Sequence, residues 1–266
     1  MRPGGPALHH LIFASILASC LRLPDRSVEQ RDRPPLLVTE ASIIDRQENV
    51  PLDIRVRLVF NQPLDPVSLD ATEITLESGE LVVQGRKKYD LLTRSLTFEP
   101  NATLRPNLWY TYRLVHPPYS IMGSAPADDE IALLFRTGDE TGEDPPPDPP
   151  AVDFGATLFP VFSGNCYCHS RINPLLGAQF SFETPEAFLH GAVAVESKEW
   201  RTWQIIHPGS HEKSYLMYKL LGDDRLGFPT ITGETMPPLP DPPLPVDTIE
   251  TIKTWIEQGA GSGVTP

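Results

Sequence analysis

Residues 94–115 read RSLTFEPNATLRPNLWYTYRLV, and apolar side chains occupy every second position in two parts of this stretch. Leu96 and Phe98 form the first alternation, and the second covers residues 110–114. An alternation with a period of two is typical of a β-strand that buries one face and exposes the other. Proline and asparagine, which favour turns, lie between the two runs. The stretch therefore predicts two consecutive strands joined by a turn.

The same period extends to both sides of this stretch. Residues 54–60 (IRVRLVF) alternate apolar side chains with arginine, and residues 131–135 (IALLF) add a further apolar run. Turn-forming residues separate these runs, and no helical period lies between them. Roughly six or seven short strands within about 100 residues are typical of an antiparallel sandwich. We therefore expect an all-β sandwich over residues 35–138.

Three segments of this region carry a family resemblance. They are Phe60–Leu64 (FNQPL), Leu96–Pro100 (LTFEP) and Leu104–Tyr110 (LRPNLWY), in that order. Together they resemble the bacterial Ig-like domain of the S-layer type, which implies a sandwich that serves as a spacer or an adhesion-type scaffold. We also expect the Tyr110 hydroxyl to hydrogen-bond to the backbone of Leu104–Pro106, as in a tyrosine corner.

The composition sets the broad class of the protein. The chain has 266 residues, 30 prolines, a formal net charge of −13 and a hydrophobic fraction of 40%. This length allows two small domains, and this hydrophobic fraction predicts folded modules rather than disorder throughout. Because each contact with a nucleic-acid phosphate needs a nearby lysine or arginine, the acidic balance argues against a nucleic-acid partner.

The N-terminus has the features of an export signal. Arg2 precedes a short apolar run, residues 11–17 (LIFASIL), which is shorter than the roughly 18 apolar residues of a membrane-spanning helix. Residues 17–20 (LASC) resemble the lipobox of bacterial lipoproteins. The resemblance implies that residues 1–19 are a lipoprotein signal peptide and that Cys20 receives the lipid.

A lipid on Cys20 would anchor the mature protein in a membrane, with residues 20–34 as a flexible tether. The sequence after Cys20 has no aspartate of the kind that retains lipoproteins in the inner membrane. We therefore expect an outer-membrane lipoprotein of the bacterial cell envelope that faces the periplasm or the surface. An ordinary signal peptide with an incidental cysteine is the alternative.

Residues 139–153 (DETGEDPPPDPPAVD) combine acidic side chains with prolines and contain no lysine or arginine. Like charges repel one another, and prolines favour the extended polyproline II conformation. We expect a semi-rigid linker here, which separates the sandwich from a second domain over residues 154–262.

The second domain contains the motif CYCH at residues 166–169. The pattern C-x-x-C-H attaches c-type haem, because two thioether bonds hold the porphyrin and the histidine binds its iron. Here the spacing is C-x-C-H, one residue shorter. Four segments resemble those of cytochrome c domains and occur in the same order: residues 158–170 (LFPVFSGNCYCHS), 207–216 (HPGSHEKSYL), 233–238 (GETMPP) and 255–260 (WIEQGA).

The resemblance to cytochrome c implies an all-α domain with one haem c and a redox protein as partner. It implies His169 and Met236 as the axial iron ligands and Cys168 as one thioether, with Cys166 as the second only through a distorted turn. A histidine and a methionine on iron suit electron transfer rather than oxygen chemistry.

Further expectations concern the helices of this domain. Ile249, Ile252 and Ile256 recur at helical spacing before Gly259, and Gly222 would end another helix. We expect Trp200 and Trp203 to pack from one side of a helix, and His190 to lie at the surface.

Other interpretations of the CYCH motif remain open. Cys166 and Cys168 could form a disulfide, because the environment outside the cytoplasm is oxidising. They could bind copper or zinc with His169 and a further ligand, the candidates being His207, His211 and Met236. The domain could also be a degenerate cytochrome without cofactor, which would leave a surface scaffold or binding lipoprotein. No acid–base pair or activated nucleophile is evident, so we do not expect an enzyme.

Overall fold

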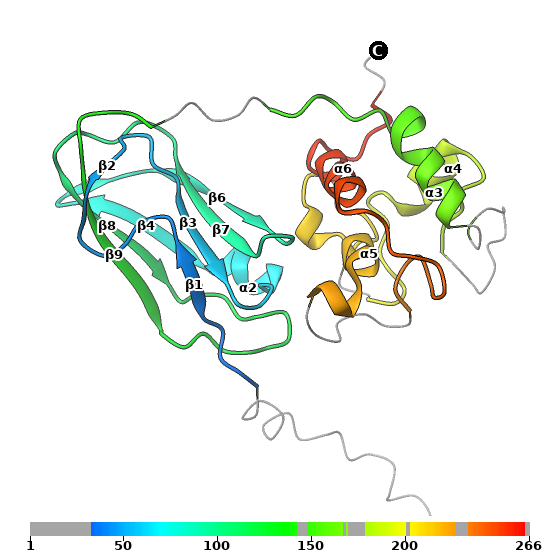
Figure 1. The fold of residues 1–266 in the computed structure, drawn as a ribbon, viewed down its shortest axis with the longest axis horizontal. Coiled ribbons are helices and arrows are strands. Elements are labelled where there is room, and N and C mark those ends of the chain that lie inside the picture. The colour runs from blue at the N-terminus through cyan, green and yellow to red at the C-terminus, as the bar shows by residue number, and fades with distance from the viewer. Residues whose placement is uncertain are drawn as a thin grey trace, which may run out of the picture. The chain divides into compact units, whose positions relative to one another are not determined.

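The computed structural model describes residues 33–142, 148–166, 169, 179–200, 203–226 and 234–263, and the strands precede most of the helices along the chain (Figure 1). The strands are β1 (Val38–Ala41), β2 (Gln47–Val50), β3 (Val56–Phe60), β4 (Glu73–Ser78), β5 (Leu81–Val82), β6 (Gly85–Asp90), β7 (Ser95–Pro100), β8 (Trp109–Val115) and β9 (Glu130–Thr137). The helical elements are α2 (Pro66–Ala71), the π-helical turn η1 (Phe154–Leu158), α3 (Phe159–Asn165), α4 (Pro185–Ala192), the 3₁₀ turn η4 (His211–Lys213), α5 (Tyr215–Leu226) and α6 (Val246–Glu257).

The strands form a sandwich of two sheets, which confirms the expected β architecture. One sheet has the order β1-β3-β7-β6 and the other has the order β2-β9-β8-β4-β5. Strand β2 pairs with β9 in parallel, so the expectation of a wholly antiparallel sandwich is wrong at that edge. The chain changes sheets between β1 and β2, and this change places β2 beside the last strand in the same direction.

The alternation in residues 94–115 places its apolar side chains in the sandwich core. Leu96 of β7 and Tyr112 and Leu114 of β8 are fully buried. Phe98 of β7 packs edge-on against Tyr112 of β8, with ring centroids 6.3 Å apart. Because β7 and β8 belong to different sheets, this aromatic pair joins the two layers.

The tyrosine corner is confirmed. The backbone N–H of Arg105 donates to the Tyr110 hydroxyl at 2.9 Å, and Tyr110 is fully buried. The hydroxyl thereby satisfies a backbone donor in the loop that leads into β8, which supports a stabilising role.

Helix α2 was not expected from the sequence. The Asp65 side chain caps its N-terminus by accepting from the backbone N–H groups of the first turn, and Pro66 occupies the first helical position. The Lys87 ammonium binds the carbonyls at its C-terminal end, those of Leu69, Asp70 and Thr72. A helix of six residues is too short to show an apolar period, so only its caps could have indicated it.

Residues 154–263 form a small helical region around a cluster of aromatic side chains. Phe154 stacks on Trp255 at 4.9 Å, and Phe188 stacks on Phe182 at 4.6 Å. All four rings are buried. This region has a few helices, and the arrangement does not by itself establish the all-α cytochrome c architecture expected for residues 154–262.

Two of the helix expectations are confirmed and one is wrong. Helix α6 buries Ile249, Ile252 and Ile256, and Gly222 interrupts α5 with a positive φ of 64°. A Cβ at Gly222 would approach the Thr235 side chain to 2.4 Å, so glycine is required there. Trp200 and Trp203 lie outside the helices, where their rings stack at 4.9 Å.

The C-terminal end of the expected linker contacts α6. The Gln258 side chain accepts from the Val152 backbone N–H at 2.9 Å and donates to the carbonyls of Pro149 and Pro150. Asp153 then caps the π-helical turn by accepting from the Ala156 N–H. This end of the linker is therefore attached to the helical region.

The expected signal peptide, Cys20 and most of the tether lie outside the described residues. Within the described part of the chain, no helix has the length and apolar character needed to cross a bilayer.

Candidate functional site

The CYCH motif begins at the end of α3. Cys166 is the C-cap of this helix, and its backbone N–H donates to the Phe162 carbonyl at 2.8 Å. The residue is 8% exposed, so the helix end buries it. Cys168 lies outside the described residues, and so do the disulfide and thioether predictions that involve it.

His169 is held in a buried position by its backbone and its ring. Its N–H donates to the Cys166 carbonyl at 2.9 Å, and its carbonyl accepts from the Phe182 N–H at 2.6 Å. The imidazole stacks on the Phe180 ring at 4.6 Å, and the residue is 9% exposed. Neither phenylalanine was singled out from the sequence for contact with the histidine.

The hydrogen bond of the His169 ring fixes its tautomer. Nδ1 lies 3.1 Å from the Phe180 carbonyl oxygen, which can only accept, so Nδ1 carries the proton. Burial lowers the pKa of His169, which keeps the imidazole neutral. In this tautomer Nε2 carries the lone pair, so it is the atom that can accept a hydrogen bond or bind a metal ion.

Met236 lies in the proline-rich loop before α6. It is partly buried against the core, and its backbone N–H donates to the Lys219 carbonyl at 2.8 Å. Lys219 itself is buried, pairs with Glu199 at 3.2 Å, and its charge acts on His169. The structure therefore connects both predicted iron ligands to Lys219, which accepts a hydrogen bond from the Met236 backbone and whose charge acts on His169.

Sequence reasoning missed Phe180, Lys219 and Glu199 around the histidine. Glu199 also accepts a hydrogen bond from the Tyr215 hydroxyl at 2.8 Å, so the ion pair is part of a polar group beside the aromatic side chains. Lys219 lies among apolar side chains in residues 215–221 (YLMYKLL), so the sequence could have marked it as a residue that needs a partner. Glu199 could not have been recognised from the sequence as the partner of Lys219, because Glu199 lies in a loop.

His211, one of the candidate ligands for copper or zinc, already has other partners in the structure. Both ring nitrogens of His211 are engaged: Nε2 accepts from the Leu91 N–H at 3.1 Å, and Nδ1 lies 3.0 Å from Glu257. The His207 ring contacts its neighbouring carbonyl at Pro208. Within the described ranges, no three histidine, cysteine or acidic side chains gather as a metal cluster.

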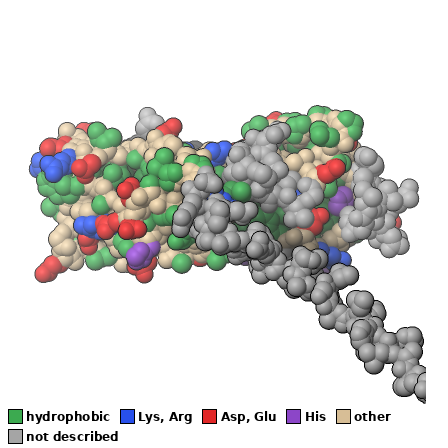
Figure 2. All heavy atoms as spheres, turned by 90° about the horizontal axis from the view of Figure 1, so that it is seen from below, with side chains coloured by type: hydrophobic (Ala, Val, Ile, Leu, Met, Phe, Trp, Pro, Cys, Tyr) green, Lys and Arg blue, Asp and Glu red, His purple; other side chains and the backbone are tan. Residues whose placement is uncertain are grey.

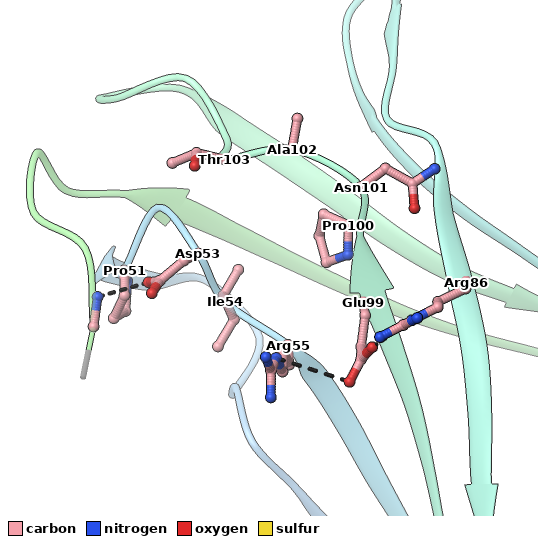
Figure 3. Close-up of a pocket in the computed structure, with 11 residues that line it drawn as sticks. Pro51, Asp53, Ile54, Arg55, Arg86, Glu99, Pro100, Asn101, Ala102 and Thr103 are labelled. Atoms are coloured by element: carbon pink, nitrogen blue, oxygen red, sulfur yellow. Dashed lines mark hydrogen bonds and ion pairs between the residues drawn. The ribbon is translucent and has the colours of Figure 1, made fainter. Parts of the chain in front are cut away.

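A hollow of about 670 Å³ lies at one end of the sandwich. Figure 3 shows Arg55 and Arg86 pointing toward the Glu99 carboxylate, and their Nε atoms lie 3.8 and 2.7 Å from it. Asp53 accepts from the Gly142 N–H. The two arginines and the two carboxylates balance in charge, so the hollow has no excess charge to select a charged ligand.

On the face drawn in Figure 2, acidic side chains lie singly or in small groups among hydrophobic and other side chains. His190 is exposed, as expected. The described part of this face therefore shows no broad basic area.

Comparison with known proteins supports the sandwich. Residues 32–131 match the family described as the bacterial Ig-like domain, and a comparison with curated proteins finds no match. The family match shows that the sandwich is Ig-like and indicates an extracellular or cell-surface bacterial protein.

Solved structures are similar only over part of the chain. An L,D-transpeptidase from Mycobacterium tuberculosis H37Rv has 15% identity and a TM-score of 0.27, with 38% of this chain and 39% of that chain covered. The S-layer protein rSbsC has 13% identity and a TM-score of 0.31, with 46% and 17% covered. PcoC, a methionine rich copper resistance protein from Escherichia coli, has 13% identity and a TM-score of 0.28, with 38% and 97% covered. This chain spans about two fifths of the transpeptidase.

Proposed function

We propose that this protein is an electron-transfer lipoprotein of the bacterial cell envelope, in which an Ig-like domain carries a domain with a single c-type haem. His169 carries the proposal, because its Nδ1–H is fixed on the Phe180 carbonyl and its neutral Nε2 is left for iron. The CYCH motif and the cytochrome-like segments around it support the same cofactor.

Three residues of the helical region would hold the haem. His169 would bind the haem iron through Nε2, Met236 would bind it through its thioether sulfur, and Cys168 would hold the porphyrin through a thioether bond. When bound, the haem supplies a one-electron couple. The aromatic cluster excludes water, and a dry surrounding stabilises the less charged state of an iron centre. An acidic surface favours a basic redox partner.

The test is the visible spectrum of the full chain expressed in a host with haem-attachment machinery. We expect a Soret band and covalently bound haem on a denaturing gel. Insertion of one alanine after Cys166 restores the C-x-x-C-H spacing and should increase the haem content. A folded protein without haem in both forms would reject the proposal.

A cofactor-free scaffold is the second candidate, and one observation favours it. Phe180 covers one face of the His169 ring at 4.6 Å, and the surrounding aromatic cluster is closely stacked. A degenerate cytochrome that had lost its cofactor would fill its interior with such rings. The spectrum of the insertion variant distinguishes the two candidates.

The membrane anchor is tested separately at Cys20. Replacing Cys20 with alanine removes the thiol that would receive the lipid, so the protein should move from the membrane fraction to the soluble fraction. Alanine at Ser19, the neighbouring position, serves as the matched control because the thiol remains. Unchanged membrane association of the Cys20→Ala variant would contradict lipidation.

A further inference from the structure

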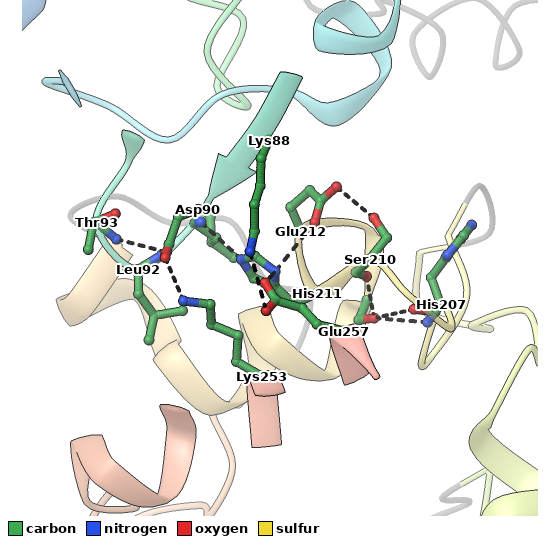
Figure 4. Close-up of polar contacts among 12 residues, drawn as sticks. Lys88, Asp90, Leu92, Thr93, His207, Ser210, His211, Glu212, Lys253 and Glu257 are labelled. Carbon is green, nitrogen blue, oxygen red and sulfur yellow. Dashed lines mark hydrogen bonds and ion pairs between the residues drawn. The ribbon is translucent and has the colours of Figure 1, made fainter. Parts of the chain in front are cut away.

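Polar contacts join the Ig-like sandwich to the helical region, and both belong to the same compact unit. The turn after β6 meets η4 and α6, as Figure 4 shows. The Leu91 N–H donates to Nε2 of His211 at 3.1 Å, and the Lys253 ammonium binds the Asp90 carboxylate. We call this group of four residues, together with Glu257, the His211 joint.

His211 has partners on both sides of the joint. The residue is 1% exposed. Its Nδ1 lies 3.0 Å from Glu257 Oε1 on α6 and 3.5 Å from Glu212 Oε2 on its own turn. Since Nε2 accepts a hydrogen bond and carboxylates only accept, the proton of the neutral ring must be on Nδ1. The joint shown here therefore requires a neutral His211.

We propose that His211 is a proton-controlled switch in the joint, which binds the turn after β6 when the imidazole is neutral and releases this turn when the imidazole is protonated. A second proton can go only to Nε2. There it would face the Leu91 N–H, so that two donors oppose each other and the hydrogen bond across the joint is lost.

Protonation of His211 removes its contact with the sandwich but not its contacts with the helical region. On the helical side, Glu257 and Glu212 contact Nδ1 and keep these contacts in both protonation states. Burial acts to raise the pKa of Glu257, but the hydrogen bond from His211 and the nearby charges of Lys88 and Lys253 lower it, so this carboxylate stays ionised. Protonation therefore strengthens the contacts of His211 within the helical region while it removes the hydrogen bond from Leu91. The ion pairs Lys253–Asp90, Lys88–Glu257 and Lys213–Asp70 still join the two regions.

On the sandwich side, β6 presents Asp90 and Lys88 to the joint. Asp90 is bound by Lys253 of α6, and its side chain also accepts from the N–H groups of Leu92 and Thr93. Lys88 lies 3.9 Å from Glu257. Because Lys253 already neutralises Asp90, this carboxylate does not replace the lost partner of Nε2.

The turn that would be released has space beside it. A hollow of about 310 Å³ adjoins the joint, and Leu92, Leu221 and Ile249 are among the residues that line it. This hollow gives the turn space on the side of Leu92, while the Leu91 side chain is buried in the core. The proposal concerns the joint alone and does not depend on haem.

The experiment measures hydrogen exchange at the Leu91 amide in the full chain between about pH 8 and about pH 5, corrected for the intrinsic rate. We expect protection to fall by about tenfold at the acidic end, because one hydrogen bond of about 1.4 kcal/mol is lost.

Two variants distinguish the protonation of His211 from a general loss of structure at low pH. In His211→Gln, the side-chain amide oxygen can accept from the Leu91 N–H near the position of Nε2 and does not titrate, so protection should be constant across the range. Glu257→Gln keeps an acceptor for Nδ1 but removes a charge that favours the imidazolium, so the transition should move to lower pH. A wild-type chain without a pH transition, or the same transition in both variants, would overturn the proposal.

Discussion

Replacing His169 with alanine is expected to lower the haem content of the protein by about tenfold or more, because the variant loses the iron ligand itself rather than a supporting contact. The Nδ1–H bond to the Phe180 carbonyl holds the ring in one orientation, with Nε2 as the coordinating atom. The measurement is the Soret absorbance divided by the protein concentration.

Controls separate ligand loss from misfolding. His190 is exposed at the end of α4, so His190→Ala should leave the spectrum unchanged. Added imidazole should occupy the space vacated in His169→Ala and restore part of the absorbance. Met236→Ala should retain haem with altered axial ligation. A His169→Ala protein with the wild-type spectrum would show that His169 is not a ligand.

Replacing Trp255 with alanine should destabilise the helical region by about 3–5 kcal/mol, because it leaves a large cavity in a core that cannot collapse. Trp255 is 1% exposed and stacks on Phe154 at 4.9 Å. Its indole N–H also donates to the Gly261 carbonyl at 2.7 Å, which would lose its donor. Urea unfolding followed by far-ultraviolet circular dichroism measures the change in the helical transition.

Matched substitutions on α6 test the packing explanation. Val246 is 63% exposed at the start of the helix, so Val246→Ala should change stability by less than about 0.5 kcal/mol. Trp255→Phe keeps most of the ring volume and should cost clearly less than the alanine variant. Equal losses in the alanine variants at both positions would show that helix propensity, rather than the aromatic core, sets the stability.

The sandwich could be predicted because its signals are local. In β7 and β8 every second side chain faces the core, so the period of Leu96, Phe98 and Tyr112 reports the buried face directly. The same holds for α6, whose isoleucines follow the helical period. The parallel pairing of β2 with β9 could not be predicted, because the choice of sheet depends on the whole topology.

The candidate site was predictable only in part. The CYCH motif identified His169, but the Phe180 carbonyl that fixes its tautomer is eleven positions later in the chain. His211 shows the limit more clearly. Its partner Leu91 is 120 positions away, so no spacing rule connects them, and the sequence suggested a metal ligand instead of a contact between domains.

The attachment of the linker to α6 has a mechanical consequence. Gln258 binds the backbone at Val152, and the Phe154 N–H donates to the Ser262 carbonyl at 3.3 Å, so both ends of the helical region are joined at one place. Tension applied through the linker would therefore reach the hydrogen bonds at this closure before it reached the stacked rings. The start and the end of the helical region are thus fastened to each other by contacts that lie outside its aromatic core.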